Sequence, residues 1–231
     1  MVQSKKTRKT AFMLIKVNDT NLYYEVHGNG TPIILVHGNS ETHKIFDVLI
    51  GELKNNHTVY AIDSRNHGKS DRTKSVSYDL MADDIIGFIE KLQIDKPIIY
   101  GFSDGGIIGL LIAIKRPRLL SKLIISGANL NPDGISKSMT TIIKLGYFFS
   151  RSKNLKMMLN EPNISADDLE KIKIPTLILA GERDVIKEKH TKLIASSIAN
   201  STLIIVPNET HSSYIIHSKK LYDLIHEFLN I

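Results

Sequence analysis

The chain has 231 residues and a mass of 25.9 kDa, the size of one large domain. Hydrophobic residues make up 42% and charged residues 23%, which excludes disordered and fibrous classes. No apolar run approaches the roughly 18 to 20 residues of a spanning helix, so an integral membrane protein is not expected. The absence of cysteine excludes disulfides, thiolate nucleophiles and cysteine-ligated metal sites.

The net charge of +6 is concentrated at the beginning of the chain. Lys5, Lys6, Arg8 and Lys9 occur there without an acid, so the rest of the chain is nearly balanced. We therefore expect no nucleic-acid partner, and we interpret residues 1–10 as a solvated basic tail. The apolar stretch that follows the tail is shorter than the core of a signal peptide, and we expect a cytoplasmic protein.

Short β-branched runs alternate with longer segments of helical periodicity, as in a mostly parallel sheet covered by helices. Residues 12–17 and 22–27 flank a turn rich in Asn and Asp, and they predict a hairpin at one edge of the sheet. Several of the remaining runs are continuously apolar, as expected of strands buried on both faces. These strand candidates lie at residues 33–36, 58–62, 98–100, 123–126, 176–180 and 202–206.

Helices are predicted where apolar residues recur three and four positions apart. These segments are residues 45–54, 79–92, 105–115, 190–198 and 219–229. Residues 128–174 interrupt the alternation, because two or three helical stretches lie there between two strands, one starting with a capping-box pattern at Ser165. We interpret residues 128–174 as a small helical cap inserted into a single domain that spans residues 11–231.

Residues 98–106, IIYGFSDGG, combine a strand, a G-x-S-x-G turn and the start of a helix. Such a turn strains the backbone at Ser103, and side chains at Gly101 and Gly105 would collide. The turn also lifts the Ser103 hydroxyl above the sheet at a helix N-terminus, which favours developing negative charge. Ser103 is therefore a candidate nucleophile, although an ordinary strand-to-helix turn uses similar residues.

A serine nucleophile needs a base, and the base needs an orienting group. The strand at 176–180 leads to Asp184, and the strand at 202–206 leads to His211. In a parallel sheet both strand ends lie at the same edge as Ser103, so we expect these three side chains to meet. Glu182 is a weaker candidate for the acid, because it lies two residues from Asp184 and points elsewhere.

These motifs resemble the α/β-hydrolase superfamily, where nucleophile, acid and histidine follow in this order. Residues 35–39, LVHGN, are similar to the H-G-x turn of that family. Residues 63–70, DSRNHGKS, are similar to its D-x-R-x-H-G-x-S loop, with Asn66 where glycine is usual. The resemblance covers nearly the whole chain. It implies a three-layer α/β fold with a mostly parallel, eight-stranded sheet.

The resemblance also implies an oxyanion hole made by the main-chain N–H groups of Asn39 and Asp104, without a cofactor. The Asp104 side chain is unusual, because a carboxylate beside a forming oxyanion opposes it unless it is turned away or paired. Two interpretations stay open: this side chain bonds the surrounding loop, or it helps to hold an amine-bearing substrate. We expect His37 and His67 to brace loops, and we expect no metal site, since the histidines lack the H-E-x-x-H spacing.

The cap holds more apolar residues than one packed stripe needs, so some of them pack on the main domain and others are candidates for a substrate pocket. We name Phe102, Tyr147, Phe148 and Met158 as pocket residues. Five cations and one acid, Asp133, lie between residues 128 and 160. They form either a solvated face or a surface that favours anionic substrates, and the second alternative opposes the amine interpretation.

The sequence thus predicts a serine hydrolase that cleaves small or medium carboxylic esters through an acyl-enzyme. Lactone, amide, thioester or carbon–carbon hydrolysis and cofactor-free perhydrolysis use the same triad and stay open as alternatives. A non-catalytic binding protein of the same fold is a further alternative. The expected partner is a small-molecule substrate, and a homodimer is one possible assembly.

Overall fold

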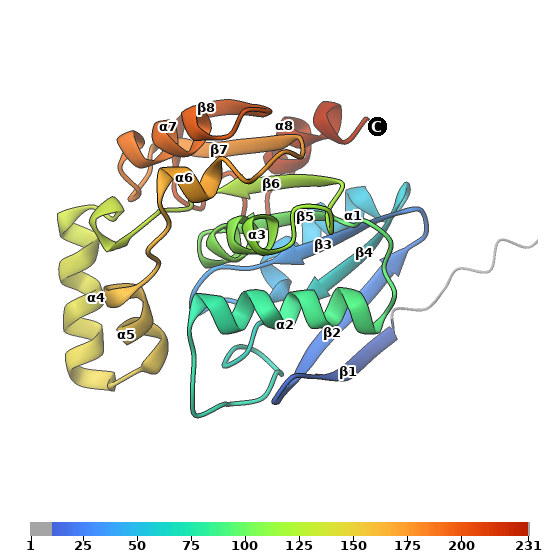
Figure 1. The fold of residues 1–231 in the computed structure, drawn as a ribbon, viewed down its shortest axis with the longest axis horizontal. Helices are drawn as coiled ribbons and strands as arrows, with labels where there is room; N and C mark the ends of the chain where they lie inside the picture. The colour runs from blue at the N-terminus through green and yellow to red at the C-terminus, as the bar shows by residue number, and fades with distance from the viewer. Residues whose placement is uncertain (1–10, 231) are drawn as a thin grey trace, which may run out of the picture.

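A computed structural model describes residues 11–230, so the basic tail inferred from the sequence lies outside the described residues. Eight strands form one sheet in the order β1-β2-β4-β3-β5-β6-β7-β8 (Figure 1). The strands are β1 (Ala11–Val17), β2 (Thr20–Gly28), β3 (Thr31–Val36), β4 (His57–Ile62), β5 (Ile98–Phe102), β6 (Lys122–Ser126), β7 (Thr176–Arg183) and β8 (Ser201–Thr210).

The strand pairing confirms the mostly parallel sheet. β1 and β2 form the expected hairpin at one edge, and β2 also runs antiparallel to β4. All other neighbouring pairs are parallel. β7 and β8 continue further than their apolar runs suggested, because they stay paired past a bulge to Arg183 and Thr210. The strand ends that carry the candidate triad therefore lie together at one edge.

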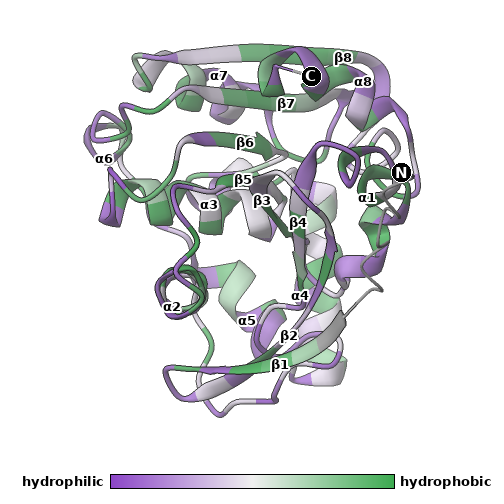
Figure 2. Ribbon diagram, turned by 90° about the vertical axis from the view of Figure 1, so that its right-hand side faces the viewer, coloured by the Kyte–Doolittle hydropathy of each residue, from purple (hydrophilic) through white to green (hydrophobic). Residues whose placement is uncertain are grey.

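Helices cover both faces of the sheet and give the molecule three layers (Figure 2). One core packs α2 and α3, with Leu169 and Ile194, against one face. The other core packs α1 and α8 against the opposite face. The helices are α1 (Asp47–Leu53), α2 (Tyr78–Lys91), α3 (Asp104–Lys115), α4 (Lys137–Ser150), α5 (Lys153–Asn160), α6 (Ala166–Leu169), α7 (Glu188–Ser197) and α8 (Lys220–Leu229), with 3-10 turns at His43–Phe46 and Pro132–Gly134.

The segment between β6 and β7 contains α4, α5 and α6. Serine hydroxyls cap all three helices, and Ser165 and Asp168 form the capping box that their spacing indicated. Glu161, which follows α5, accepts a hydrogen bond from the Tyr78 N–H at 3.0 Å. Asn154 of α5 lies 3.1 Å from the His67 ring. These contacts tie α5, which pairs with α4, to the main body of the protein.

No helix within residues 11–230 is long and apolar enough to cross a membrane.

Candidate active site

Ser103, Asp184 and His211 are each the first residue after a strand, following β5, β7 and β8 respectively. Because these strands run parallel, the three residues lie above the same edge of the sheet. The structure therefore brings together three side chains that are up to 108 residues apart in the chain.

The turn between β5 and α3 holds Ser103 with φ at 52° and ψ at −113°. This region is unfavourable for a residue with a Cβ atom. Gly101 and Gly105 permit the turn: a Cβ atom on Gly101 would lie 2.1 Å from the Gly105 carbonyl oxygen. A Cβ atom on Gly105 would lie 2.0 Å from the carbonyl oxygen of Val36. The steric reason for glycine at these positions agrees with the sequence interpretation.

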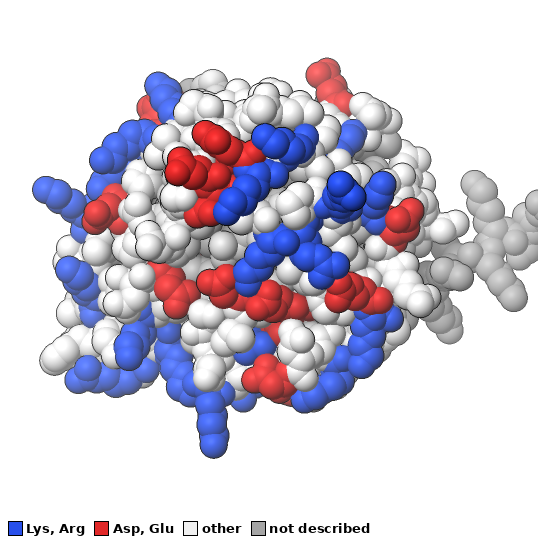
Figure 3. All heavy atoms as spheres, in the orientation of Figure 1, with Lys and Arg blue, Asp and Glu red and all other residues white. Residues whose placement is uncertain are grey.

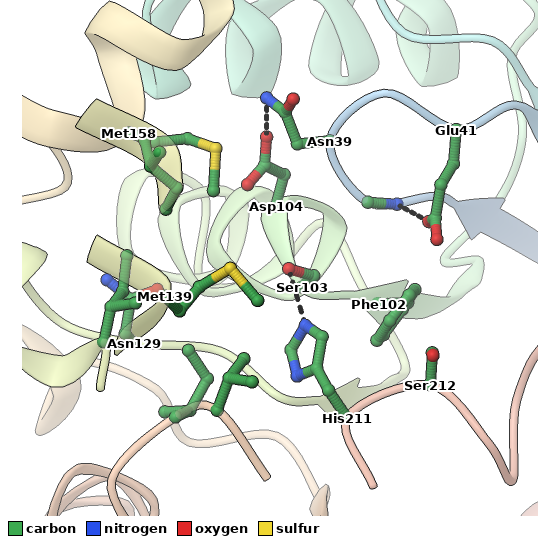
Figure 4. Close-up of a pocket in the computed structure, with 15 residues that line it drawn as sticks. Asn39, Glu41, Phe102, Ser103, Asp104, Asn129, Met139, Met158, His211 and Ser212 are labelled. Atoms are coloured by element: carbon green, nitrogen blue, oxygen red, sulfur yellow. Dashed lines mark hydrogen bonds between the residues drawn. The ribbon is translucent and has the colours of Figure 1, made fainter. Parts of the chain in front are cut away.

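The His211 ring lies between the other two groups. Its Nδ1 is 2.6 Å from Asp184 Oδ1. Its Nε2 is 3.1 Å from Ser103 Oγ, a contact drawn as a dashed line in Figure 4. An ionised carboxylate only accepts hydrogen bonds, so it stabilises the tautomer with the proton on Nδ1 and leaves Nε2 free to accept the serine proton. Phe102 packs against the imidazole, with 4.9 Å between the ring centroids.

Asp184 is fixed by a second hydrogen bond, because Oδ1 also accepts the Ile186 N–H at 2.8 Å. Its Oδ2 is buried and accepts no hydrogen bond from the described residues. Glu182, the weaker candidate for the acid, is exposed and accepts the Asn208 N–H at 2.7 Å. The geometry therefore favours Asp184 over Glu182 as the partner of His211.

Asn39 and Asp104 line the same pocket as Ser103, and a hydrogen bond connects their side chains. Asn39 Nδ2 donates to Asp104 Oδ2 at 3.0 Å, and the Tyr78 hydroxyl donates to Asp104 Oδ1 at 2.7 Å. Burial raises the pKa of Asp104 above its ordinary value, while these two donors oppose the shift. Both carboxylate oxygens are thus committed to protein donors, which favours the loop-bonding interpretation of this side chain over the amine-binding one.

A pocket of about 190 Å³ opens beside Ser103. Figure 4 places Met139 and Met158 on one side of Ser103, and Phe102, Glu41 and Ser212 on the other. The apolar lining residues are Phe102, Ile135, Met139, Ile143, Met158, Val185 and Ile186. No lysine or arginine lines this pocket within the described part of the chain.

Of the four pocket residues named from the sequence, Phe102 and Met158 line the cavity. Tyr147 and Phe148 do not, and 61% of Phe148 is exposed. The direction of α4 explains Phe148, because Met139 and Ile143 lie on the face toward the pocket and Phe148 lies on a different face of the helix. Tyr147 shares a face with Ile143 but lies one turn further along α4, beyond the lining of the pocket. Periodicity alone did not indicate which apolar face of this helix is turned inward.

Glu41 is a pocket residue that the sequence analysis missed. Its Oε2 accepts the Gly38 N–H at 3.0 Å. Burial raises the pKa of Glu41 to about 7, although the Gly38 hydrogen bond and the nearby His211 lower it. The signal in the sequence was the position of Glu41 three residues after Gly38, inside the turn that carries the proposed oxyanion donor.

The loops around the site are held by buried polar groups. The ring of His37 bonds the Gly38 carbonyl oxygen at 2.7 Å and accepts the Ser64 N–H at 3.1 Å, and burial lowers its pKa to about 4. His67 lies 3.0 Å from the Arg65 carbonyl oxygen. Both rings therefore brace loops, as expected. Within residues 11–230, no group of three or more His, Asp or Glu side chains is arranged to hold a metal ion.

Comparison with known proteins agrees with this architecture. Residues 31–151 match the family described as alpha/beta hydrolase fold. The AB hydrolase superfamily protein YisY of Bacillus subtilis is 30% identical, over 90% of this chain and 95% of its own. The chain belongs to the α/β-hydrolase fold family, a family of hydrolases that includes esterases.

Solved structures share the fold at lower identity. An esterase from Exiguobacterium antarcticum, EaEST, matches with a TM-score of 0.85 and 22% identity, over 96% of this chain and 100% of its own. A meta-cleavage product hydrolase from Pseudomonas fluorescens matches with a TM-score of 0.79 and 20% identity, over 94% and 97% of the two chains. At this identity the likeness concerns the fold and leaves the reaction open.

Proposed function

We propose that the protein is a serine hydrolase that cleaves small or medium carboxylic esters through an acyl-enzyme. The observation that carries this proposal is the continuous row of hydrogen-bonding groups from Asp184 through His211 to Ser103. This row ends in a pocket with an apolar wall that suits an acyl or alkyl group.

In the proposed acylation step, Ser103 Oγ forms a bond to the ester carbonyl carbon while His211 Nε2 takes the hydroxyl proton. The carbonyl oxygen becomes an oxyanion and accepts hydrogen bonds from the main-chain N–H groups of Asn39 and Asp104. When the intermediate collapses, the bond to the alcohol oxygen breaks and His211 gives its proton to that oxygen. Asp184 orients the ring and stabilises the imidazolium.

In deacylation, water takes the place of the alcohol. His211 accepts a proton from the water, whose oxygen bonds to the acyl carbon. The bond between that carbon and Ser103 Oγ then breaks, and the proton returns to the serine. The products are a carboxylic acid and the restored hydroxyl group.

The test is a panel of nitrophenyl esters of increasing acyl length, with lactones and amino-acid esters, assayed on the wild type and on Ser103→Ala. We expect hydrolysis of short and medium esters, and a loss of at least about 10⁴-fold in the variant. A fluorophosphonate probe should label the wild type and leave Ser103→Ala unlabelled. Ester hydrolysis that survives in the variant would contradict the assignment of the nucleophile, and failure of both assays would favour a non-catalytic binding protein.

A further inference from the structure

Helix α4 exposes an apolar surface that the catalytic proposal does not use. Six large hydrophobic residues of the described chain are strongly exposed, and four of them lie on this helix. Ile142, Leu145, Phe148 and Phe149 are 61%, 57%, 61% and 76% exposed, and we refer to them as the outer face of α4. The other two, Leu14 and Leu193, lie singly on β1 and α7. Contiguous apolar patches, unlike scattered residues, mark interaction sites.

The spacing of these residues explains why they form one surface. Positions 142, 145 and 149 lie three and four apart and therefore share one side of the helix, with position 148 next to them. A different side of α4 holds Ile143, which packs with Ile135 and Ile186. The helix is thus apolar on two sides, and packing within the protein accounts for only one.

The surface around the outer face is positively charged. Residues 137–160 contain five cations and no carboxylate. All five are exposed, and none forms an ion pair within residues 11–230. The cations are Lys137, Lys144, Arg151, Lys153 and Lys156. Figure 3 shows blue and white spheres without red at this lower left corner of the molecule, where Figure 1 places α4 and α5.

Aromatic rings gather with one of these cations at the end of α4. The Arg151 guanidinium lies 5.5 Å from the centroid of the Phe148 ring, and Phe148 contacts Phe149 edge to face at 5.3 Å. Bulky apolar groups next to Lys and Arg are the combination that binds the headgroup region of a bilayer.

The charge of this surface also disfavours a second copy of the chain as the partner that covers the outer face of α4. A symmetric dimer through this surface would bring the same five cations of both copies together, with no carboxylate on α4 or α5 to neutralise them. An anionic surface complements them, and a lipid bilayer also accepts the apolar side chains.

We propose that the outer face of α4 docks onto an anionic lipid bilayer. The four apolar side chains enter the boundary between headgroups and acyl chains, while the surrounding lysines and Arg151 contact lipid phosphates. Met139 and Ile143 of the same helix line the pocket beside Ser103, so docking places the pocket near the bilayer. This inference does not depend on the chemistry proposed for Ser103.

The test measures binding of the full-length protein to vesicles of phosphatidylcholine and to vesicles of phosphatidylcholine and phosphatidylglycerol in equal parts. We expect the wild type to partition at least about tenfold more strongly to the anionic vesicles. Phe148→Ser combined with Phe149→Ser should lower that partitioning at least about tenfold. The matched control is Leu14→Ser with Leu193→Ser, which removes two exposed apolar side chains elsewhere and should change binding less than about twofold.

The contribution of the cations to vesicle binding is tested by Lys144→Glu combined with Lys153→Glu. The matched control is Lys54→Glu combined with Lys173→Glu, which changes the same charge at exposed sites elsewhere. Glutamine at positions 5, 6, 8 and 9 removes the contribution of the basic tail. The proposal would be overturned if the Phe148/Phe149 and Lys144/Lys153 variants bound anionic vesicles like the wild type. It would also be overturned if binding were lost only in the variant with glutamine in the basic tail. A dimer that dissociates when Phe148 and Phe149 are replaced would also overturn it, and would assign the surface to self-association. Circular dichroism confirms that each variant is folded.

Discussion

His211 Nδ1 lies 2.6 Å from Asp184 Oδ1, the short distance of a charge-assisted hydrogen bond. Asp184→Asn keeps the shape of the acid but replaces the acceptor of the imidazole proton with an amide. We expect kcat for ester hydrolysis to fall on the order of 10³- to 10⁴-fold, with little change in KM. The matched control is Glu182→Gln, which alters the exposed acid two residues away. Equal losses in both variants would contradict the assignment of Asp184.

Gly127 lies next to the His211 imidazole. A Cβ atom at this position would lie 2.6 Å from His211 Cε1, and the φ angle of 63° disfavours any side chain. Gly127→Ala should therefore displace the ring and lower kcat about 100-fold or more. Gly51→Ala is the control, since no atom of residues 11–230 outside the neighbouring backbone lies within 4 Å of the added methyl group. Full activity of Gly127→Ala would show that the ring tolerates a different position.

The Tyr78 hydroxyl donates a hydrogen bond to the carboxylate of the buried Asp104. Tyr78→Phe leaves one carboxylate oxygen without a donor, and we expect the free energy of unfolding to fall by about 1–3 kcal/mol. Urea unfolding measures this change. Tyr24→Phe is the matched control, because the Tyr24 hydroxyl donates to the Met13 sulfur, a weak acceptor, at 3.4 Å. A loss below about 0.5 kcal/mol in Tyr78→Phe would mean that the carboxylate finds another partner.

Asp63 makes the stability of the fold depend on acid pH. Burial opposes its ionisation, but the His43 ring, the His43 N–H and the Lys69 N–H lower the pKa of Asp63 to about 2. A carboxyl whose pKa is lowered by folding stabilises the protein above the unfolded value, near 4, and loses this contribution as the pH falls toward 2. Asp63→Asn should lower the free energy of unfolding at pH 7 by about 2 kcal/mol and flatten its dependence between pH 4 and 2. Asp95→Asn, at an exposed site, should change neither.

Glu41 makes stability depend on pH in the opposite direction to Asp63, since folding raises the pKa of Glu41 from 4.5 to about 7. The folded state then binds more protons than the unfolded state between these values, so stability falls as the pH rises from 4.5 to 7. Glu41→Gln removes this penalty. We expect it to raise the free energy of unfolding at pH 8 by about 2 kcal/mol, less than the full shift because the side chain is partly exposed, and to leave it unchanged at pH 4. An equal effect at both pH values would exclude ionisation as the cause.

The order of helices and strands along the chain was predictable, because each of them depends on residues that are close together in the sequence. The turn around Ser103 needs glycine at fixed positions, and the strands leading to Asp184 and His211 are continuous apolar runs. Once the strands are known to be parallel, the convergence of these residues follows from topology. A local signal also predicted the hairpin at the edge of the sheet, because a turn rich in Asn and Asp separates two alternating runs.

The lining of the pocket was not predictable in the same way. Helix α4 has apolar residues on two sides, so its sequence does not distinguish Met139, which lines the pocket, from Phe148, which is exposed. The contact between Gly127 and His211 depends on the exact path of two loops. The pKa of Glu41 is raised chiefly because folding buries this side chain. Such features arise from tertiary packing, which periodicity does not encode.

The backbone angles of Ser103 have a consequence for how this protein can change over time. Holding a serine at φ 52° lowers the stability of the folded state on the order of 1–3 kcal/mol, a cost that glycine at this position would avoid. Ser103→Gly is thus expected to yield a more heat-resistant protein without the proposed nucleophile, so selection for thermal endurance alone would act against the serine that the proposed reaction needs.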